Sequence, residues 1–565
     1  MKVLACLAVV AVLSLLGGPP AVAQQSAQPV VRMGNWIEVG NELFMHIIGS
    51  IDANYRTTQN YDFESRVRDR VNSRTVTSST NHEGSADIHY AEVRLGADFR
   101  YQKSLLAQVL FEQQITMDAS TVDAGNLNSN NPGGTDIFGR SAPSENAVVH
   151  LERYWIDYRF AGTPLRMRVG SDLWRLDQAA MVNDDDPRFA VFADFGNLEL
   201  TAAVAIERES QRVGLTNDND LIYYMFSAGY DLKPHRIQFD VVYARDRFSG
   251  ADVSTGDGGA DGFRGQRTDG VNVSLSWSGK AGPLLGLVQG MVSTGTARGG
   301  TGFGLSPGVA GSRDYDILGF GAIVKLEADL GIIRPFIGAM FATGDGDPTD
   351  NKLHGFNHLA FRSSGTGVSS SIFQALETSP ASGGHRDYFC PGGMTGANNS
   401  IRPGGNANLA IGNSVFAGVT ECGHTIDNPF NDRIGGDSHP GISTVYSNPG
   451  GLLIPVGVRV FPLKGHELRA FYVYKQFIKT QLLEIAYNLP RGSISKEQVH
   501  EIGAAWQWTL NPHFDIRLSG TAGFAGAGYK DLANLADCNA TVGGVQPCEA
   551  DDVALQGHAR FRARF

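Results

Sequence analysis

Hydrophobic and polar residues alternate one by one through much of the chain. The stretch "YAEVRLGADFRY" (90–101) places apolar side chains at every second position and mostly charged ones between them, and the chain ends in the same way with "VALQGHARFRARF" (553–565). Successive side chains of an extended strand point to opposite faces, so each stretch has one apolar and one polar face. This period of two predicts β-strands.

The lengths of the connections distinguish a soluble β-sandwich from a membrane barrel, since the strands of both alternate. Short links, such as residues 102–103 and 511–512, alternate along the chain with long polar stretches, such as residues 117–146 and 345–450. Bacterial outer-membrane barrels have short periplasmic turns and longer extracellular loops. We therefore expect an all-β fold, a transmembrane antiparallel β-barrel of about 18 strands with long extracellular loops and short periplasmic turns.

The alternating segments give the positions of the expected strands. They cover residues 44–56, 87–101, 104–116, 147–160, 165–176, 187–195, 197–209, 220–231, 235–247, 269–278, 284–296, 314–329, 332–344, 451–462, 466–481, 497–510, 513–526 and 552–565. After residue 23 the sequence has no apolar run as long as the ~18 residues of a spanning helix, which leaves strands as the elements that cross a membrane.

Residues 1–23 have the pattern of a cleaved secretory signal peptide. Lys2 precedes the apolar stretch 3–16, and Ala21-Val22-Ala23 forms the cleavage site before Gln24. We expect residues 24–43 to form a periplasmic N-terminal segment and residues 44–565 the barrel, with 345–450 as a long extracellular loop. The predicted location is the outer membrane of a Gram-negative bacterium, with lipid as the surrounding partner.

The net charge of the chain indicates which kinds of partner the protein can bind. The net charge is -11, and loss of Lys2 with the signal peptide makes it -12. Nucleic-acid binders are typically basic, so the sequence predicts no nucleic-acid partner.

Four cysteines remain after Cys6 leaves with the signal peptide: Cys390, Cys422, Cys538 and Cys548. An even number in an exported protein favours disulfides, most simply within the two pairs that are close in sequence. The alternative is free or metal-bound thiols, although the chain has no C-x-x-C spacing.

The last strand indicates how the barrel is assembled. Its apolar face, which includes Phe561 and the terminal Phe565, is expected to meet lipid, while pairing of the last strand with the first removes the unpaired edges. A terminal Phe after alternating apolar residues resembles the signal by which outer-membrane barrels are recognised. We therefore expect the barrel-assembly machinery and periplasmic chaperones as partners, and an assembly role for both phenylalanines.

A barrel of this size leaves an aqueous channel, so the polar faces of the strands predict a pore lining. The candidate pore-lining residues are Glu92, Arg94, Arg153, Asp157, Arg166, Arg168, Arg469, Lys475, Arg517 and Arg560. Rings of Arg or Lys favour anions in a pore. The alternative is a mixed, weakly selective wall, because acidic residues share the same face.

Other chemistry is weakly indicated. Asp345, Asp347 and Asp350 form a weak candidate calcium site, but the EF-hand pattern is missing and a simple acidic turn is favoured. The sequence has no G-x-S-x-G, phosphate loop or haem-attachment motif. We expect a protein that is not an enzyme and uses no cofactor.

Passive transport is the function that these features predict: a water-filled channel for small hydrophilic solutes, with anions as the candidate preference. Two alternatives stay open. One is an exporter of an acidic polysaccharide such as alginate, and the other is a scaffold or adhesion barrel that binds a partner through its long loops. Nothing in the sequence identifies a subunit interface, so the oligomeric state is open.

Two segments carry a family resemblance. At "ATGDGDPTDNKLHGFNHL" (342–359) and "LNPHFDIRLSGTAGFAG" (510–526) the chain resembles outer-membrane porins of the alginate-export type. The resemblance implies an 18-stranded barrel with an arginine-rich and lysine-rich lumen that passes an anionic polysaccharide. In that family a long periplasmic turn closes the barrel from below, whereas the corresponding turn here is only Asn511-Pro512. The resemblance therefore favours the fold more than polysaccharide export.

Overall fold

The computed structural model describes most of the predicted strands and turns. The described residues are 36–59 without 41, 86–116 without 103, 149–176 without 173, 182–184, 187–208, 221–246, 267–301, 312–356 without 348 and 349, 450–531 without 482, 483, 485–489 and 529, and 553–565. The predicted signal peptide, the four cysteines and most of the 345–450 segment lie outside these residues.

The described residues form 22 strands. They are β1 (Ile37–Gly40), β2 (Leu43–Gln59), β3 (Ala86–Tyr101), β4 (Leu105–Thr116), β5 (His150–Arg159), β6 (Leu165–Ser171), β7 (Trp174–Leu176), β8 (Val182–Asp184), β9 (Pro187–Asp194), β10 (Leu198–Arg208), β11 (Leu221–Leu232), β12 (His235–Asp246), β13 (Arg267–Ala281), β14 (Leu284–Thr301), β15 (Ser312–Ala328), β16 (Ile333–Ala342), β17 (Lys352–Leu353), β18 (Gly451–Val460), β19 (His466–Phe477), β20 (Glu497–Asn511), β21 (Phe514–Ala525) and β22 (Val553–Arg564). In the described part of the chain no helix has the length and apolar character needed to cross a membrane.

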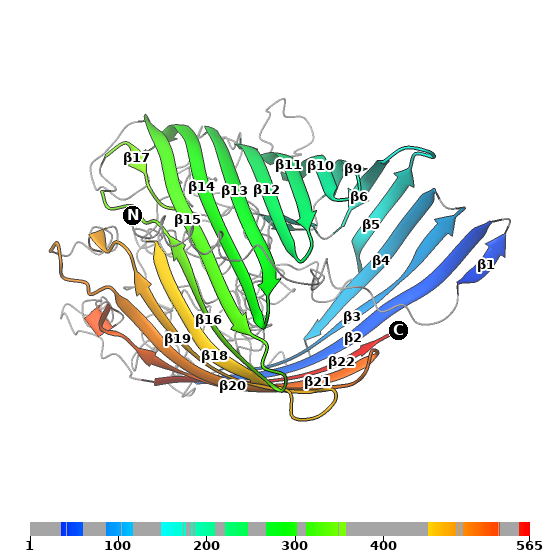
Figure 1. Cartoon of the computed structure of the whole chain (residues 1–565). Helices are drawn as coiled ribbons and strands as arrows, with labels where there is room; N and C mark the ends of the chain where they lie inside the picture. The colour runs from blue at the N-terminus through cyan, green and yellow to red at the C-terminus, as the bar shows by residue number, and fades with distance from the viewer. Residues whose placement is uncertain are drawn as a thin grey trace, which may run out of the picture.

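Eighteen of these strands form one closed ring. From β2 to β22, leaving out β7, β8 and β17, each strand pairs antiparallel with the next, and β22 pairs back onto β2. Figure 1 shows β2 and β22, from opposite ends of the chain, side by side. The 18-stranded antiparallel barrel is confirmed, and each predicted strand range overlaps one strand of the ring.

Three small pairings were not predicted. β1 lies within the segment 24–43 and pairs with the first residues of β2, and Figure 1 shows it projecting beyond the barrel wall. β7 and β8 pair only with each other among the described strands, and β17 pairs in parallel with β15. Each of these strands has two to four residues, which is too short for an alternating pattern to be visible in the sequence.

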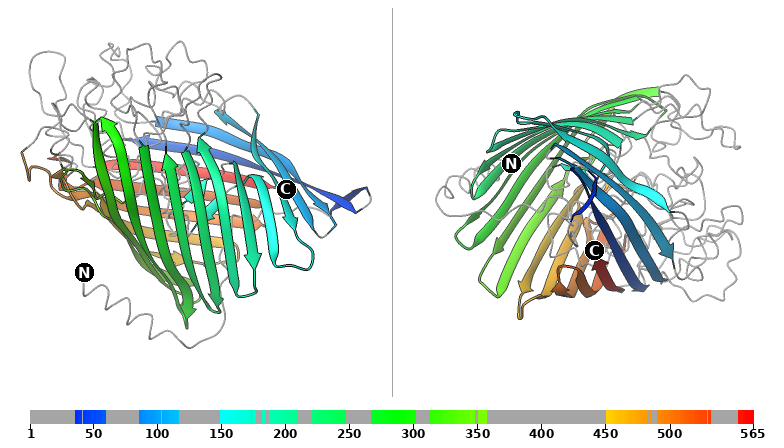
Figure 2. Two further views of the ribbon diagram at one scale, coloured as in Figure 1. Left: turned by 90° about the horizontal axis from the view of Figure 1, so that it is seen from above. Right: turned by 90° about the vertical axis from the view of Figure 1, so that its right-hand side faces the viewer.

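The short turns all join consecutive strands of the ring at the same end. They follow β3, β5, β9, β11, β13, β15, β18 and β20, and each has two to five residues. Figure 2 shows the strands running alongside one another between these turns and the opposite rim. At the turn after β18, Gly465 has φ +81°, and a Cβ there would lie 2.4 Å from the carbonyl oxygen of Thr509. Glycine is therefore required at this position.

The polarity of the barrel is the reverse of that of a soluble protein. Along each strand, one face exposes large apolar side chains, such as Ile156 and Leu275, which are both 57% exposed. The other face points into the barrel and carries buried polar groups, among them Asp240 and Ser274, which are both 0% exposed. Burying polar groups while exposing apolar ones is unfavourable in water, so this fold suits a surrounding apolar medium.

The last residue of the chain, Phe565, takes part in closing the barrel. Phe565 donates a backbone hydrogen bond to the carbonyl of Gly49 at 2.9 Å and accepts one from its N–H at 2.8 Å. The ring of Phe565 covers Gly49, because a Cβ on this glycine would lie 2.5 Å from the ring and 2.8 Å from the carbonyl oxygen of Arg94. Phe561, four residues earlier, is 46% exposed on the outer face, as the alternation predicts. The assembly role of both phenylalanines stays a prediction.

Candidate pore lining

The predicted pore-lining residues lie on the inner face wherever their side chains are described. Arg94, Arg153, Asp157, Arg166, Arg168, Arg469, Arg517 and Arg560 alternate with outward apolar neighbours such as Leu95, Ile156, Val169, Leu468, Leu518 and Phe561. Glu92 has the same alternation parity as Arg94 in β3, and Lys475 the same parity as Arg469 in β19. Their side chains lie outside the described part of the structure. Their role as pore-lining residues stays a prediction.

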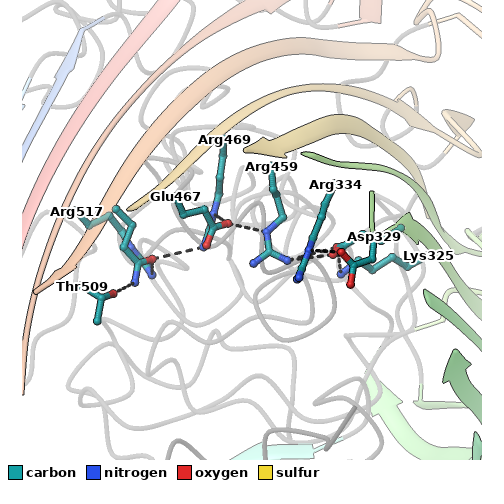
Figure 3. A network of polar contacts seen from close by, with 10 residues as sticks. Lys325, Asp329, Arg334, Arg459, Glu467, Arg469, Thr509 and Arg517 are labelled. Carbon is teal, nitrogen blue, oxygen red and sulfur yellow. Dashed lines mark hydrogen bonds and ion pairs between the residues drawn. The ribbon is translucent and has the colours of Figure 1, made fainter. Parts of the chain in front are cut away.

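A chain of charged contacts crosses β15, β18 and β19 near the short turns (Figure 3). The carboxylate of Glu467 accepts hydrogen bonds from Nε of Arg459 and of Arg469, both at 2.6 Å. Arg459 also lies 3.2 Å from the carboxylate of Glu327, which pairs with Lys325 at 3.4 Å. Each carboxylate thus joins two cations, and the contacts run from β15 past β16 to β18 and β19.

The same chain continues onto β20 and β21 through an amide. Oε1 of Gln507 accepts hydrogen bonds from Arg469 at 3.4 Å and from Arg517 at 2.9 Å. Its own amide group donates to Thr509 at 3.4 Å. The guanidinium groups of β19 and β21 are therefore linked through one neutral side chain on the strand between them.

Ion pairs also link the last strand, β22, to its two neighbours in the ring, β21 and β2. Asp515 pairs with Arg560 at 3.5 Å and with Arg564 at 3.2 Å, and Arg562 of the last strand pairs with Asp52 of β2. The Arg562–Asp52 pair crosses the seam between β22 and β2 and joins residues 510 positions apart, whereas Asp515 lies on β21, the strand that precedes β22 in the chain.

A second arginine cluster lies on β5, β6 and β9, about half-way round the ring from the network on β15 to β21. Asp157, only 2% exposed, accepts hydrogen bonds from Arg166 and Arg168, both at 2.9 Å. The two guanidinium groups lie over aromatic rings, that of Arg166 at 4.0 Å from the Phe192 centroid and that of Arg168 at 4.1 Å from Trp155. Carboxylate and rings together hold both cations in fixed positions.

The inner face of β13 and β14 differs from these clusters. It carries Asn272, Ser274, Gln289 and Ser293, of which Gln289 donates to the Ser274 hydroxyl at 3.1 Å. Amides and hydroxyls bind water and solutes without adding charge. Guanidinium groups are therefore concentrated on particular strands of the inner wall.

Several members of these networks were not predicted from the sequence. Arg459, Glu327 and Gln507 lie at inward positions of β18, β15 and β20. The inward parity of Arg459 follows from its strand, so this residue was predictable in principle. Its partners come from strands that are distant in sequence, with Glu327 and Arg459 separated by 132 positions, and the register of those strands supplies the contact.

The predicted acidic turn after β16 contains a buried carboxyl group. Asp345 is fully buried; its Oδ1 accepts a hydrogen bond from the N–H of Asp347 at 3.2 Å, while no hydrogen bond to Oδ2 is found among the described residues. The carboxylate of Asp350 instead accepts from the N–H of Lys352 at 2.7 Å. Burial, together with the nearby charges of Asp350 and Asp347, raises the pKa of Asp345 to about 6, although the Asp347 N–H and His354 oppose this shift.

This segment packs against the inner face of β15. Thr343 donates its hydroxyl to the carbonyl of His354 at 2.7 Å, and Phe356 donates its N–H to the carbonyl of Thr343 at 2.9 Å. The ring of Phe356 fills the space over Gly321, where a Cβ would lie 2.7 Å away. The first residues of the predicted 345–450 loop thus return to the barrel wall.

We expect the packing of residues 343–356 to weaken as pH rises. The folded pKa of Asp345, about 6, exceeds its ordinary 3.8, so stabilisation by the neutral carboxyl group is complete below pH 3.8 and is lost as pH rises through 6. The full difference corresponds to about 3 kcal/mol. Hydrogen exchange at the Thr343 and Phe356 amides measures it. Asp345→Asn should retain protection at pH 8, and equal pH profiles for both proteins would contradict this account.

The weak calcium candidate in this turn stays a prediction. Among the described residues no group of three or more His, Cys, Asp or Glu side chains is arranged to hold a metal ion. Two of the three candidate carboxylates, Asp345 and Asp350, accept backbone hydrogen bonds within the turn. A simple acidic turn, which the sequence favours over calcium binding, accounts for these two hydrogen bonds.

Comparison with known proteins gives matches among solved structures. No family model and no curated protein matches the sequence. The barrel is similar to Acinetobacter baumannii OccAB1 (TM-score 0.47, 9% identity, covering 96% of this chain and 100% of that one) and to a BenF-like porin from Pseudomonas fluorescens Pf-5 (TM-score 0.45, 10% identity, 92% and 98%). It is also similar to Pseudomonas aeruginosa OccK2 (OpdF) in complex with glucuronate (TM-score 0.42, 11% identity, 92% and 98%).

These values limit what the matches mean. All three TM-scores lie below 0.5 and all three identities below 25%, so the function of this barrel has to be inferred from its own residues. The matches do not single out porins of the alginate-export type, and that resemblance stays at the level of the two sequence segments.

Proposed function

We propose that the protein is an outer-membrane porin, a water-filled channel for passive diffusion of small hydrophilic solutes. The observation that carries this proposal is a closed 18-stranded ring whose outer face is apolar and whose inner face carries polar and charged groups beside buried apolar ones. Closure leaves no strand edge in the hydrocarbon, and a ring of this size is wide enough for an aqueous channel. Transport, and not enzymatic chemistry, is the function that this architecture supports.

Aromatic side chains at the two ends of β19 and β20 support the placement in a bilayer. Near the short turn, His466 stacks on Trp506 and Trp508, while near the other rim the hydroxyl of Tyr472 lies 2.6 Å from His500. His500 and Trp508 are eight positions apart on β20, or about 26 Å along the strand, which at a strand tilt of about 40° corresponds to about 20 Å across the membrane. This separation is of the order of the apolar band of about 25 Å that lies between two aromatic girdles.

The wall charges favour small anions among the solutes. Guanidinium groups of Arg469, Arg517 and Arg560 are fixed on the inner face by contacts with Glu467, Gln507 and Asp515, respectively. Fixed cations in a narrow aqueous lumen raise the local concentration of anions. We therefore include a preference for anionic solutes in the proposal.

The remaining parts of the proposal concern export and orientation. Residues 1–23 act as a cleaved signal peptide, residues 24–43 lie in the periplasm with the short turns, and the 345–450 segment faces the outside of a Gram-negative cell. Disulfides form among the four cysteines Cys390, Cys422, Cys538 and Cys548. The assembly machinery recognises Phe561 and Phe565. Fractionation of the producing bacterium and peptide mapping without reduction test these points.

Swelling of liposomes that contain the purified protein tests the transport function. We expect swelling in isotonic solutions of small sugars, and faster swelling with a small monocarboxylate than with a neutral solute of the same size, because the wall is cationic. Liposomes with heat-denatured protein serve as the control. Correctly folded barrels that leave liposomes impermeable would contradict a porin and favour polymer export or partner binding.

A further inference from the structure

The links between arginines on the inner wall are of two chemical kinds. Among the described residues, six carboxylates each join two cationic groups: Asp157, Asp172, Glu327, Asp329, Glu467 and Asp515. Gln507 joins Arg469 and Arg517 in the same manner, but through the oxygen of an amide. A carboxylate neutralises one of the two charges that it joins, whereas an amide neutralises none.

We propose that Gln507 is a specificity-determining residue of the pore, which holds Arg469 and Arg517 in place for passing anions while adding no negative charge. This inference rests on the proposed porin function and its anion preference. It assigns Gln507 as a positioning residue, since it acts through the two guanidinium groups.

The register of the sheet explains why one side chain can do this. Gln507 on β20 lies directly opposite Arg517 on β21, while Arg469 on β19 is opposite Ala505, two positions away on the same face of β20. Inward side chains two residues apart and across one strand are within reach of long side chains. The small Ala505 leaves the space through which Arg469 reaches Gln507.

The amide sets the charge of the connected chain. From Lys325 through Glu327, Arg459, Glu467, Arg469 and Gln507 to Arg517, these seven residues comprise four cations and two anions, and their own charges sum to +2. Glutamate at position 507 would make it +1 and would place the added charge between two guanidinium groups. Arg469 and Arg517 are 6% and 7% exposed, so both are held against the wall and the network positions them as a unit.

Two substitutions separate the two parts of the role. Gln507→Glu keeps an acceptor for both arginines and adds a negative charge, while Gln507→Leu removes the acceptor and leaves the charge unchanged. Reversal potentials of single channels in a KCl gradient measure the permeability ratio of anion to cation. We expect Gln507→Glu to lower this ratio about two- to fivefold, and Gln507→Leu to lower it by a smaller factor.

Gln289→Leu is the matched control, because Gln289 is also an inward amide but donates to the uncharged hydroxyl of Ser274. It should keep the ratio of the unchanged protein, and heat-modifiable mobility in gels should show that all variants fold. An unchanged ratio in both Gln507 variants, or a fall in the glutamate variant alone, would overturn the positioning role. A protein that does not conduct before any substitution would instead overturn the proposed porin function.

Discussion

Replacing Gly49 with alanine is expected to destabilise the closed barrel. A Cβ at this position would lie 2.5 Å from the Phe565 ring and 2.8 Å from the carbonyl oxygen of Arg94. The ring can move, but the carbonyl belongs to the backbone of the neighbouring strand β3, so β2 must shift against β3. Overpacking of this kind lowers the free energy of unfolding by about 1–3 kcal/mol. Urea unfolding in detergent measures this loss, and heat-modifiable mobility reports the closed fraction.

Gly290→Ala provides a matched control for this substitution. Gly290 also lies within a strand of the ring, in β14, but a Cβ added to it would have no other atom within 4 Å among the described residues. Alanine there should leave stability unchanged or raise it by up to about 1 kcal/mol, since glycine weakens a strand interior. If Gly49→Ala were as stable as Gly290→Ala, the contact between Phe565 and Gly49 would not be what closes the seam.

Replacing Glu467 with glutamine is expected to weaken the wall of the pore and to increase its anion preference. The carboxylate joins Arg459 and Arg469 at 2.6 Å each, and its side chain is only 13% exposed. Loss of hydrogen bonds between charged groups should lower the free energy of unfolding by about 1.5–3 kcal/mol. Removal of a negative charge beside two cations should at the same time raise the permeability ratio of anion to cation.

Glu199→Gln is the control, because it removes the same charge from an exposed pair. Glu199 lies 2.6 Å from Arg236, but its side chain is 52% exposed. Exposed ion pairs contribute about 0–1 kcal/mol, so this variant should unfold close to the unchanged protein. Equal unfolding midpoints in urea for the two variants would show that the Glu467 network does not stabilise the wall.

The alternation of side chains made the barrel predictable. In β22, and in β3 from Ala91 onward, every second residue is apolar, and a closed sheet between lipid and water needs that pattern on its strands. The inward direction of Arg94 and Arg517 follows from the same parity. Strand ends were predicted less sharply where the alternation continues beyond the last residue that pairs with a neighbouring strand. After β16, for example, the chain leaves the sheet at Thr343 and folds back toward β15.

Contacts between strands were less predictable, because they depend on register. The alternation places Glu467 on the inner face, yet nothing in its own strand shows that its carboxylate reaches Arg459 of β18. The role of Gln507 depends on the neighbours on both sides of β20. A pattern in one strand gives the direction of a side chain, while its partner is fixed only when the ring is closed.

The central claim is that this ring encloses a water-filled, anion-preferring pore. Single-channel recording of the refolded protein in a planar bilayer, with a KCl gradient across it, tests this claim most directly. We predict stepwise conductance with a reversal potential on the anion side, and a smaller anion preference after Arg94→Ala and Arg153→Ala, which remove inward cations of β3 and β5. Folded, inserted barrels that never conduct, or channels that prefer cations, would contradict it.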